Sequence, residues 1–295
     1  MEQIHTEKIE FKKVRDFGEK LNATIAFFRQ NFKKLGRALL FIIVPGAVLS
    51  AILSNIYQSI MIKTLRSGSF LNFSFPSEVF PVLLGMIAIG LLQVSLIYAL
   101  VYEYIILYID KGVDVDTKAV WQKAKKGFLK TLGGLFIGYI LIVLGVFLLL
   151  IPGIYLTMPV ALAFIIMFRE QTGFFTALGR SLKLIRGKWW STFGLLLITT
   201  IIMVLIGYLF SIPFYLFSGA SMFSSLSSGE EVSSFNQIMK ILASIVYNLV
   251  VFVLYSIPLI ALAFQYFNLV ERKESVGLMD KINTMGGEKK NEGTY

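Results

Sequence analysis

The stretch TLGGLFIGYILIVLGVFLLLIPGIYLTMPVALAFIIMF, residues 131–168, decides the fold, because its 38 residues include no Asp, Glu, Lys, Arg or His. As a single α-helix it would be about 57 Å long at about 1.5 Å per residue, nearly twice the hydrocarbon thickness of a bilayer. Pro152 and Gly153 lie near its middle, where proline removes a backbone donor and glycine permits a sharp reversal. The stretch therefore predicts a hairpin of two transmembrane helices with its structural turn at Pro152 and Gly153.

Four further stretches are almost free of charge: 38–62, 79–109, 191–229 and 241–270, of which only 79–109 holds a charged residue, Glu103. Hydrophobic residues make up 56% of the 295 positions, and the mean hydropathy is +0.73, values typical of membrane proteins. The predicted fold class is all-α. We expect a polytopic helical membrane protein with six transmembrane helices as three hairpins, each preceded by an amphipathic cytoplasmic helix. The spans are expected near 38–61, 80–109, 131–151, 154–169, 192–217 and 239–267.

Basic residues fall almost entirely on one side of these spans. Of the 28 Lys and Arg residues, 25 lie in alternate loops and at the two termini, and only Lys63, Arg66 and Lys240 lie on the other side. By the positive-inside rule, both termini face the cytoplasm. The chain has no cysteine, which excludes disulfides and thiolate sites and fits a multi-pass protein of the bacterial cell (inner) membrane.

Three segments are expected along the chain. Residues 1–37 form a cytoplasmic amphipathic N-terminal segment, 38–270 a six-helix transmembrane domain, and 271–295 a disordered cytoplasmic tail. A weak repeat runs through them, because the motifs Ala99–Tyr102, Ala161–Phe164 and Ala261–Phe264 recur in the even spans. The repeat predicts an interfacial helix, a span, an outer turn and a second span, three times over. Chance recurrence of common apolar residues is the alternative.

The basic segments between the spans have the pattern of interfacial helices. In residues 21–35, apolar side chains recur every three or four positions, with basic residues among them. Two interpretations stay open for these segments: they grip anionic lipid or present a cytoplasmic platform to a protein partner, or they are orienting anchors. The candidate lipid-headgroup contacts are Lys123, Lys125, Lys126, Arg180, Lys183, Arg186, Trp121, Trp189 and Trp190. Nucleic acid is not an expected partner.

Glu103 is the one charged residue well inside a predicted span, since Arg169 and Lys240 lie at the edges of theirs. A buried ionisable group in a membrane costs about 2.5–3.5 kcal/mol on insertion scales, so it is usually paired or functional. The candidate intramembrane polar site is Glu103, Gln93 and Tyr102. Two interpretations stay open, a structural or snorkelling glutamate and a proton, ion or headgroup site. Small residues at Gly134 and Gly138 predict close helix packing.

Chemistry-bearing motifs are scarce. His5 is the only histidine and lies in the polar N-terminal tail, and no aspartate lies within a predicted span. A histidine-based catalytic or metal site, an intramembrane aspartyl pair and a phosphate-binding glycine loop are therefore not expected. We expect no catalytic residue, no metal and no cofactor.

One stretch resembles a known family. The residues that carry the resemblance are Ile151-Pro152-Gly153-Ile154-Tyr155, Glu170, Gly173, Ala177, Arg180-Ser181, Leu184, Gly187-Lys188-Trp189-Trp190 and Gly194. They are similar to a bacterial six-span inner-membrane family related to the membrane domain of glycerophosphodiester phosphodiesterases. In that family's bifunctional members a separate soluble barrel is catalytic, and we expect no such barrel in this chain. The resemblance implies a membrane module with the hydrolase domain absent.

Two main functions follow as expectations. The first is a non-enzymatic integral inner-membrane protein that interacts with lipid or acts as a scaffold through its basic interfacial helices. The alternative is a transporter or flippase-like carrier of a small amphiphile, with Glu103 as the coupling residue. An enzyme that acts on a lipid without histidine is a third, weaker alternative.

Overall fold

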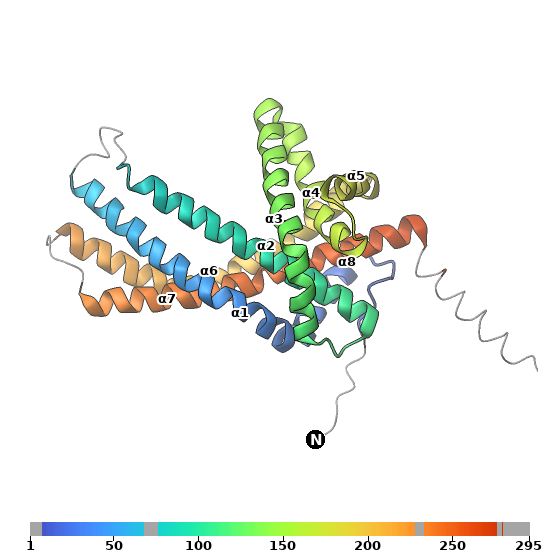
Figure 1. The fold of residues 1–295 in the computed structure, drawn as a ribbon, viewed down its shortest axis with the longest axis horizontal. Coiled ribbons are helices and arrows are strands. Elements are labelled where there is room, and N and C mark those ends of the chain that lie inside the picture. The colour runs from blue at the N-terminus through green and yellow to red at the C-terminus, as the bar shows by residue number, and fades with distance from the viewer. Residues whose placement is uncertain (1–7, 68–75, 228–232, 276–278, 280–295) are drawn as a thin grey trace, which may run out of the picture. The chain divides into compact units, whose positions relative to one another are not determined.

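The computed structural model describes residues 8–67, 76–227, 233–275 and 279, and these residues are 88% helical with no strand (Figure 1). They form eight helices. The helices are α1 (Phe17–Arg66), α2 (Val79–Lys111), α3 (Thr117–Leu148), α4 (Leu150–Arg169), α5 (Phe174–Ile185), α6 (Trp189–Ser227), α7 (Ser234–Leu254) and α8 (Ser256–Glu274).

The six predicted spans are confirmed as helices. Within the described residues, α1, α2, α3, α4, α6 and the pair α7–α8 give six segments long and apolar enough to cross a membrane. The chain is therefore a multi-pass helical membrane protein. Of the amphipathic segments, only α5 is a separate helix, whereas the other two are the first parts of α1 and α3. The break after α5 falls at Gly187, whose φ of 77° favours glycine.

The helices contribute to two compact units, which cut across the three segments expected from the sequence. The first unit contains the described residues within 1–35, 98–200 and 257–295, and the second unit those within 36–97 and 201–256. In the second unit, α1 packs on α2 through Gly46, where a Cβ atom would collide with the side chain of Gln93. In the same unit α6 packs on α7, with Phe214 stacked on Tyr247 at 6.3 Å between ring centroids.

The core of the first unit is built from the C-terminal parts of α2 and α4 and from most of α8. The recurring motifs noted in the sequence lie here, and Tyr102, Phe164 and Phe264 are all buried. Tyr98 of α2 contacts Phe164 of α4 edge-on, with ring centroids 4.9 Å apart. The repeated residues are therefore the shared core of this unit, where aromatic rings can bury the largest apolar area.

The N-terminal segment contributes to that core, which the sequence analysis did not predict. Phe11 is buried and stacks on Phe264 with ring centroids 4.1 Å apart. The backbone nitrogen of Ile9 donates to the hydroxyl of Tyr108 at 2.8 Å. The backbone nitrogen of Arg15 donates to the Oδ1 atom of Asn268 at 2.8 Å. Residues 8–16 are therefore part of the folded unit and not a polar tail.

In the first part of α1, the buried face differs from the apolar stripe in residues 21–35. Thr24, Phe27 and Asn31 are buried, whereas Ile25 and Phe32 are exposed on this unit. An exposed apolar stripe flanked by basic side chains is typical of a helix that lies at a membrane surface.

The turn of the α3–α4 hairpin is not where the sequence placed it. The chain reverses at Leu149, which is extended (φ −153°, ψ 111°), and Pro152 and Gly153 lie in the first turn of α4. Proline is tolerated there because its missing N–H would have no partner within the helix. Gly153 instead permits close helix contact, because a Cβ atom at Gly145 would lie 2.9 Å from its Cα atom.

Close packing through the small residues of α3 is confirmed. A Cβ atom at Gly138 would lie 2.8 Å from the Cγ1 atom of Val160, and one at Gly134 would lie 3.1 Å from the ring of Phe164. Figure 1 shows α4 side by side with the C-terminal part of α3. The hairpin is therefore held by backbone-to-side-chain contact that only glycine allows.

The C-terminal segment expected to be disordered from residue 271 begins as helix. α8 continues to Glu274, so the first four residues of the predicted tail are folded. Residues 276–278 and 280–295 lie outside the described residues, and the prediction of disorder falls mostly on them.

Candidate functional site

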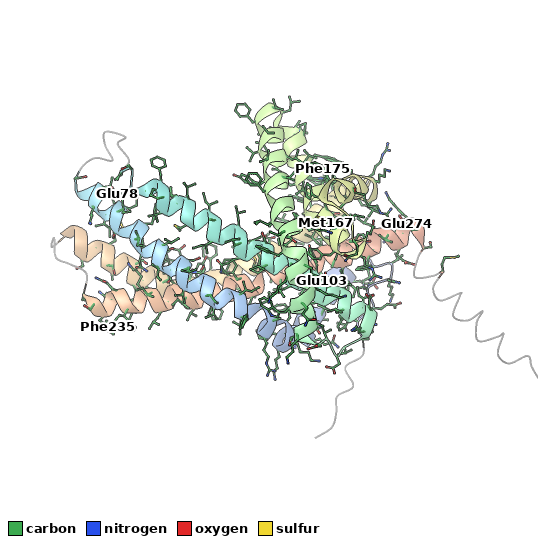
Figure 2. All side chains as sticks on the ribbon, viewed as in Figure 1. Glu78, Glu103, Met167, Phe175, Phe235 and Glu274 are labelled. Carbon is green, nitrogen blue, oxygen red and sulfur yellow. The ribbon has the colours of Figure 1, made fainter. Side chains whose placement is uncertain are left out.

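A pocket of about 480 Å³ lies in the first unit, where α2, α3 and the end of α4 meet. Figure 2 labels two of the residues that line it, Glu103 and Met167. We call it the basic pocket. Its lining comprises four basic side chains, two acidic ones and a partly apolar remainder. These residues are Lys123, Lys126, Lys130, Arg169, Glu103, Asp110, Ile106, Gly127, Met167, Phe168 and Gln171.

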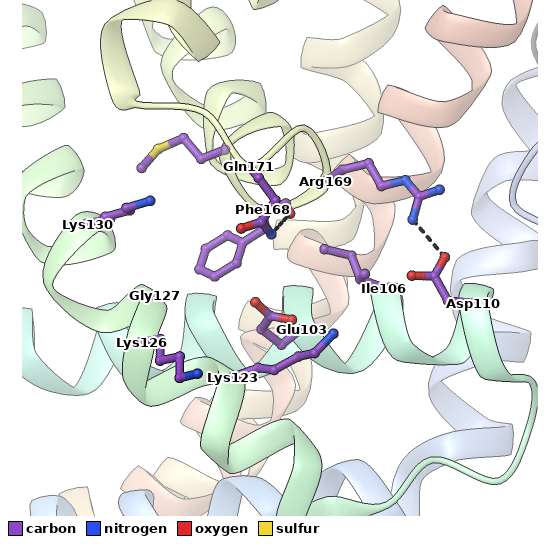
Figure 3. A pocket seen from close by; sticks show the side chains of 11 residues that line it. Glu103, Ile106, Asp110, Lys123, Lys126, Gly127, Lys130, Phe168, Arg169 and Gln171 are labelled. Atoms are coloured by element: carbon purple, nitrogen blue, oxygen red, sulfur yellow. Dashed lines mark hydrogen bonds and ion pairs between the residues drawn. The ribbon is translucent and has the colours of Figure 1, made fainter.

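The lysines of the basic pocket come from one helix and share its face. Lys123, Lys126 and Lys130 are spaced three and four residues apart, so that they form one stripe of α3. The neighbouring stripe, with Val120 and Ala124, is buried and fixes the rotation of the helix. Buried apolar residues therefore orient the three ammonium groups toward the pocket, where Figure 3 shows them around the same space.

Gly127 lets the pocket form between these lysines. A Cβ atom at this position would lie 2.6 Å from the Cε1 atom of Phe168, so any larger residue would displace that ring. Phe168 lies in the middle of the pocket in Figure 3, and Gln171 donates from its Nε2 atom to the backbone oxygen of Phe168 at 2.6 Å. The ring gives the basic pocket an apolar wall.

Two carboxyl groups face the four bases in different ways. Asp110 accepts a hydrogen bond from the Nη1 atom of Arg169 at 2.9 Å, so these two charges compensate each other. Glu103 is only 6% exposed, and its carboxyl group makes no hydrogen bond or ion pair with any other residue that the structure describes. Figure 3 shows this group pointing into the pocket between Phe168 and Lys123.

The basic pocket lies at the boundary between the charged and charge-free parts of the hairpin. Lys130 directly precedes the charge-free residues 131–168 and Arg169 directly follows them. Each arm of the hairpin above this level has a length of about 27–29 Å, close to the ~30 Å hydrocarbon core of a bilayer. The tip carries exposed apolar side chains, such as Phe147 at 87% exposure. With the hairpin across the membrane, the pocket would lie at headgroup level.

Arg180, which the sequence analysis named as a headgroup contact, is engaged inside the protein. Its guanidinium group makes two hydrogen bonds to the carboxylate of Glu274, at 2.6 and 2.9 Å, and one to Glu170 at 3.0 Å. The hydrogen bonds to Glu274 raise the pKa of Arg180 above its usual value. Glu170 also accepts a hydrogen bond from the hydroxyl of Tyr266 at 2.9 Å. This network ties α5 to α8, and it makes Arg180 a structural residue.

The other predicted headgroup contacts lie outside the basic pocket. Lys125 lies 5.9 Å over the ring of Trp121, while Lys183 and Arg186 are exposed on and just after α5. The Nε1 atom of Trp189 donates to the backbone oxygen of Tyr155 at 2.9 Å. Trp190 is 77% exposed. An exposed Trp ring on this unit fits a position at the interface between membrane and water.

The predicted polar site is divided. Glu103 lines the basic pocket, whereas Tyr102 is buried against Tyr98 and Phe168 and is not part of the lining. Gln93 belongs to the second unit, where the hydroxyl of Ser50 donates to its Oε1 atom at 3.4 Å. The three residues therefore have different surroundings.

Four polar members of the site were not predicted from the sequence: Asp110, Lys130, Arg169 and Gln171. A signal was available, because Asp110 and Arg169 are the first charged residues after two apolar stretches, and their opposite signs favour pairing. Among the described residues, no cluster of His, Cys, Asp and Glu could hold a metal ion. No family model, curated protein or solved structure matches the chain.

Proposed function

We propose that this chain is a non-enzymatic, multi-pass protein of the bacterial inner membrane that holds the phosphate of a lipid headgroup in the basic pocket. Both termini would face the cytoplasm, and the bound lipid would belong to the cytoplasmic leaflet. The chain would be a relative of the membrane module of glycerophosphodiester phosphodiesterases.

The observation that carries this proposal is the convergence of four cations on a pocket with an apolar wall, at the end of a hairpin of bilayer length. After Asp110 compensates Arg169, three lysines face Glu103, and two positive charges remain in excess. Basic residues near an anionic membrane surface contribute about 1 kcal/mol each. The pocket volume of about 480 Å³ falls within the range of small-ligand sites.

The chemistry of the lining supports one orientation of the lipid in the pocket. The ammonium groups of α3 are suited to phosphate oxygens, and the Phe168 ring and Met167 are suited to the first carbons below the phosphate. The bulk of the acyl chains would remain in the bilayer, along the exposed apolar side chains of the hairpin. This arrangement favours a role in holding or presenting a lipid at the membrane surface.

The double substitution Lys123→Gln and Lys126→Gln tests the proposal. Removing two phosphate contacts worth about 1 kcal/mol each should weaken lipid binding about 30-fold. The measurement is native mass spectrometry of the full chain in detergent, titrated with phosphatidylglycerol. The matched control is Lys118→Gln with Lys125→Gln, which removes the same charge from the same helix outside the pocket. Equal weakening by both pairs, or by neither, would refute the site.

A carrier of a small amphiphile, with Glu103 as the coupling residue, is the second candidate. The burial of Glu103 without a protein partner among the described residues favours it. In proteoliposomes with a pH gradient, a carrier would show amphiphile uptake that Glu103→Gln abolishes. The lipid-holding role instead predicts stoichiometric retention without uptake.

A further inference from the structure

Glu103 has a place in the basic pocket that phosphate binding alone does not explain. A carboxyl group facing three lysines weakens the attraction of the site for an anion, and yet this one is nine-tenths buried and aimed into the cavity. It has no hydrogen-bond or ion-pair partner among the residues that the structure describes. Its carboxyl oxygens open into the pocket, so a group that enters the pocket can donate a hydrogen bond to them.

No side chain that lines the pocket donates a hydrogen bond to Glu103, so a bound ligand could supply the donor. On α2, Ile106 is one turn away and Asp110 is already paired with Arg169. Gln171, the one neutral polar side chain of the lining, donates its amide to the backbone oxygen of Phe168. Lys123 of α3 lines the same pocket, and no ion pair joins it to Glu103.

We infer that the basic pocket selects lipids whose headgroup carries a hydrogen-bond donor beyond the phosphate, and that the Glu103 carboxyl group accepts from that donor. This inference rests on the proposed function and specifies its ligand class. The phosphate would lie against Lys123, Lys126 and Lys130, and the donor would lie deeper, against Glu103. The donor is an O–H group in a glycerol headgroup or an N–H group in an ethanolamine headgroup. The Glu103 carboxyl group can accept a hydrogen bond from either.

Matched lipid pairs separate charge from donor chemistry. Phosphatidylglycerol and phosphatidylmethanol carry the same charge, and only the first has headgroup hydroxyls. Phosphatidylethanolamine and phosphatidylcholine are both zwitterionic, and only the first has N–H donors. For the unmodified chain in detergent, native mass spectrometry should show the donor-bearing member of at least one pair bound about tenfold or more tightly, the range of a hydrogen bond to a charged group. The pair that shows the preference identifies the donor.

Glu103→Leu should abolish the preference for the donor-bearing lipid. The contribution of the phosphate to binding should remain. We expect the affinity ratio within that pair to fall to about one, while phosphatidylmethanol binds at least as well as before because a repulsive carboxyl group is gone. The melting temperature should change little, because leucine has a similar volume and the carboxyl group has no hydrogen bond or ion pair to lose among the described residues.

The outcomes separate this inference from the proposed function. If Glu103→Leu preserves the preference, or the unmodified chain shows none in either pair, the inference is wrong while lysine-dependent binding stands. If Lys123→Gln with Lys126→Gln leaves binding of all four lipids unchanged, the proposed function itself fails. A fall in melting temperature for Glu103→Leu would indicate a structural glutamate and would also overturn the inference.

Discussion

Gly153→Ala should destabilise the α3–α4 hairpin more than any other single-methyl change in the first unit. A Cβ atom at this position would collide with the backbone nitrogen of Val146 and would lie 2.6 Å from the carbonyl carbon of Gly145. Backbone atoms cannot rotate away as a side chain can, so the two helices must separate. Overpacking costs about 1–3 kcal/mol in ordinary cores, and we expect at least about 3 kcal/mol here. Thermal unfolding of the purified chain in detergent should show a melting temperature lower by about 6 °C or more.

Gly133→Ala is the matched control for this experiment. Position 133 lies on the same hairpin, and a Cβ atom there would meet nothing within 4 Å. Because alanine favours helix over glycine by about 1 kcal/mol, the melting temperature should stay the same or rise slightly. Similar losses for both variants would contradict the close approach of α3 and α4 at Gly145 and Gly153.

Phe11→Ala should cause the second large loss, although residue 11 lies in a polar stretch near the start of the chain. Phe11 is 2% exposed, stacks on Phe264, and makes edge contacts with Phe27 and Phe267 at 5.2 and 5.6 Å between centroids. Truncating a buried phenylalanine costs about 3–5 kcal/mol, because the cavity left behind does not collapse fully. The measurement is the free energy of unfolding or the melting temperature in detergent.

Phe175→Ala provides the comparison, since it removes the same side chain from a position that is 66% exposed on the same unit. We expect it to change the stability in detergent by less than about 1 kcal/mol. If Phe11→Ala were equally mild, the N-terminal segment would not be part of the core.

The membrane-spanning helices could be predicted from sequence because the bilayer leaves few alternatives. A stretch without charge and of sufficient length must satisfy its backbone internally, so charge spacing alone locates the spans. The turn at Leu149 could not be located in this way. Proline fits the start of a helix as well as a turn, and glycine fits a close contact between helices as well as a turn. The sequence does not distinguish these uses.

Phe11 escaped prediction for a related reason. One aromatic residue in a polar segment has no periodic partners, so no helix or strand pattern marks it as buried. Its neighbours in space, Phe27 and Phe264, are far from it along the chain.

The candidate site was predicted in part. Glu103 was recognisable as a single charge in an apolar stretch, and Lys123 and Lys126 as members of a basic amphipathic helix. The distinction between these lysines and Arg180 required the structure, because Arg180 meets Glu274 across 94 positions of sequence. The sequence alone does not show which basic residues form ion pairs within the protein and which stay available for a ligand.

Photo-crosslinking of the full chain in vesicles tests the central claim, lipid binding in the basic pocket, most directly. The probe is phosphatidylglycerol with a photoreactive group beside the phosphate, and the adducts are mapped by peptide mass spectrometry. We predict that adducts concentrate on Ile106, Met167 and Phe168, and that Lys123→Gln with Lys126→Gln removes them while Lys118→Gln with Lys125→Gln does not. Adducts spread along the exposed faces of the spans, and equal in both variants, would contradict the account.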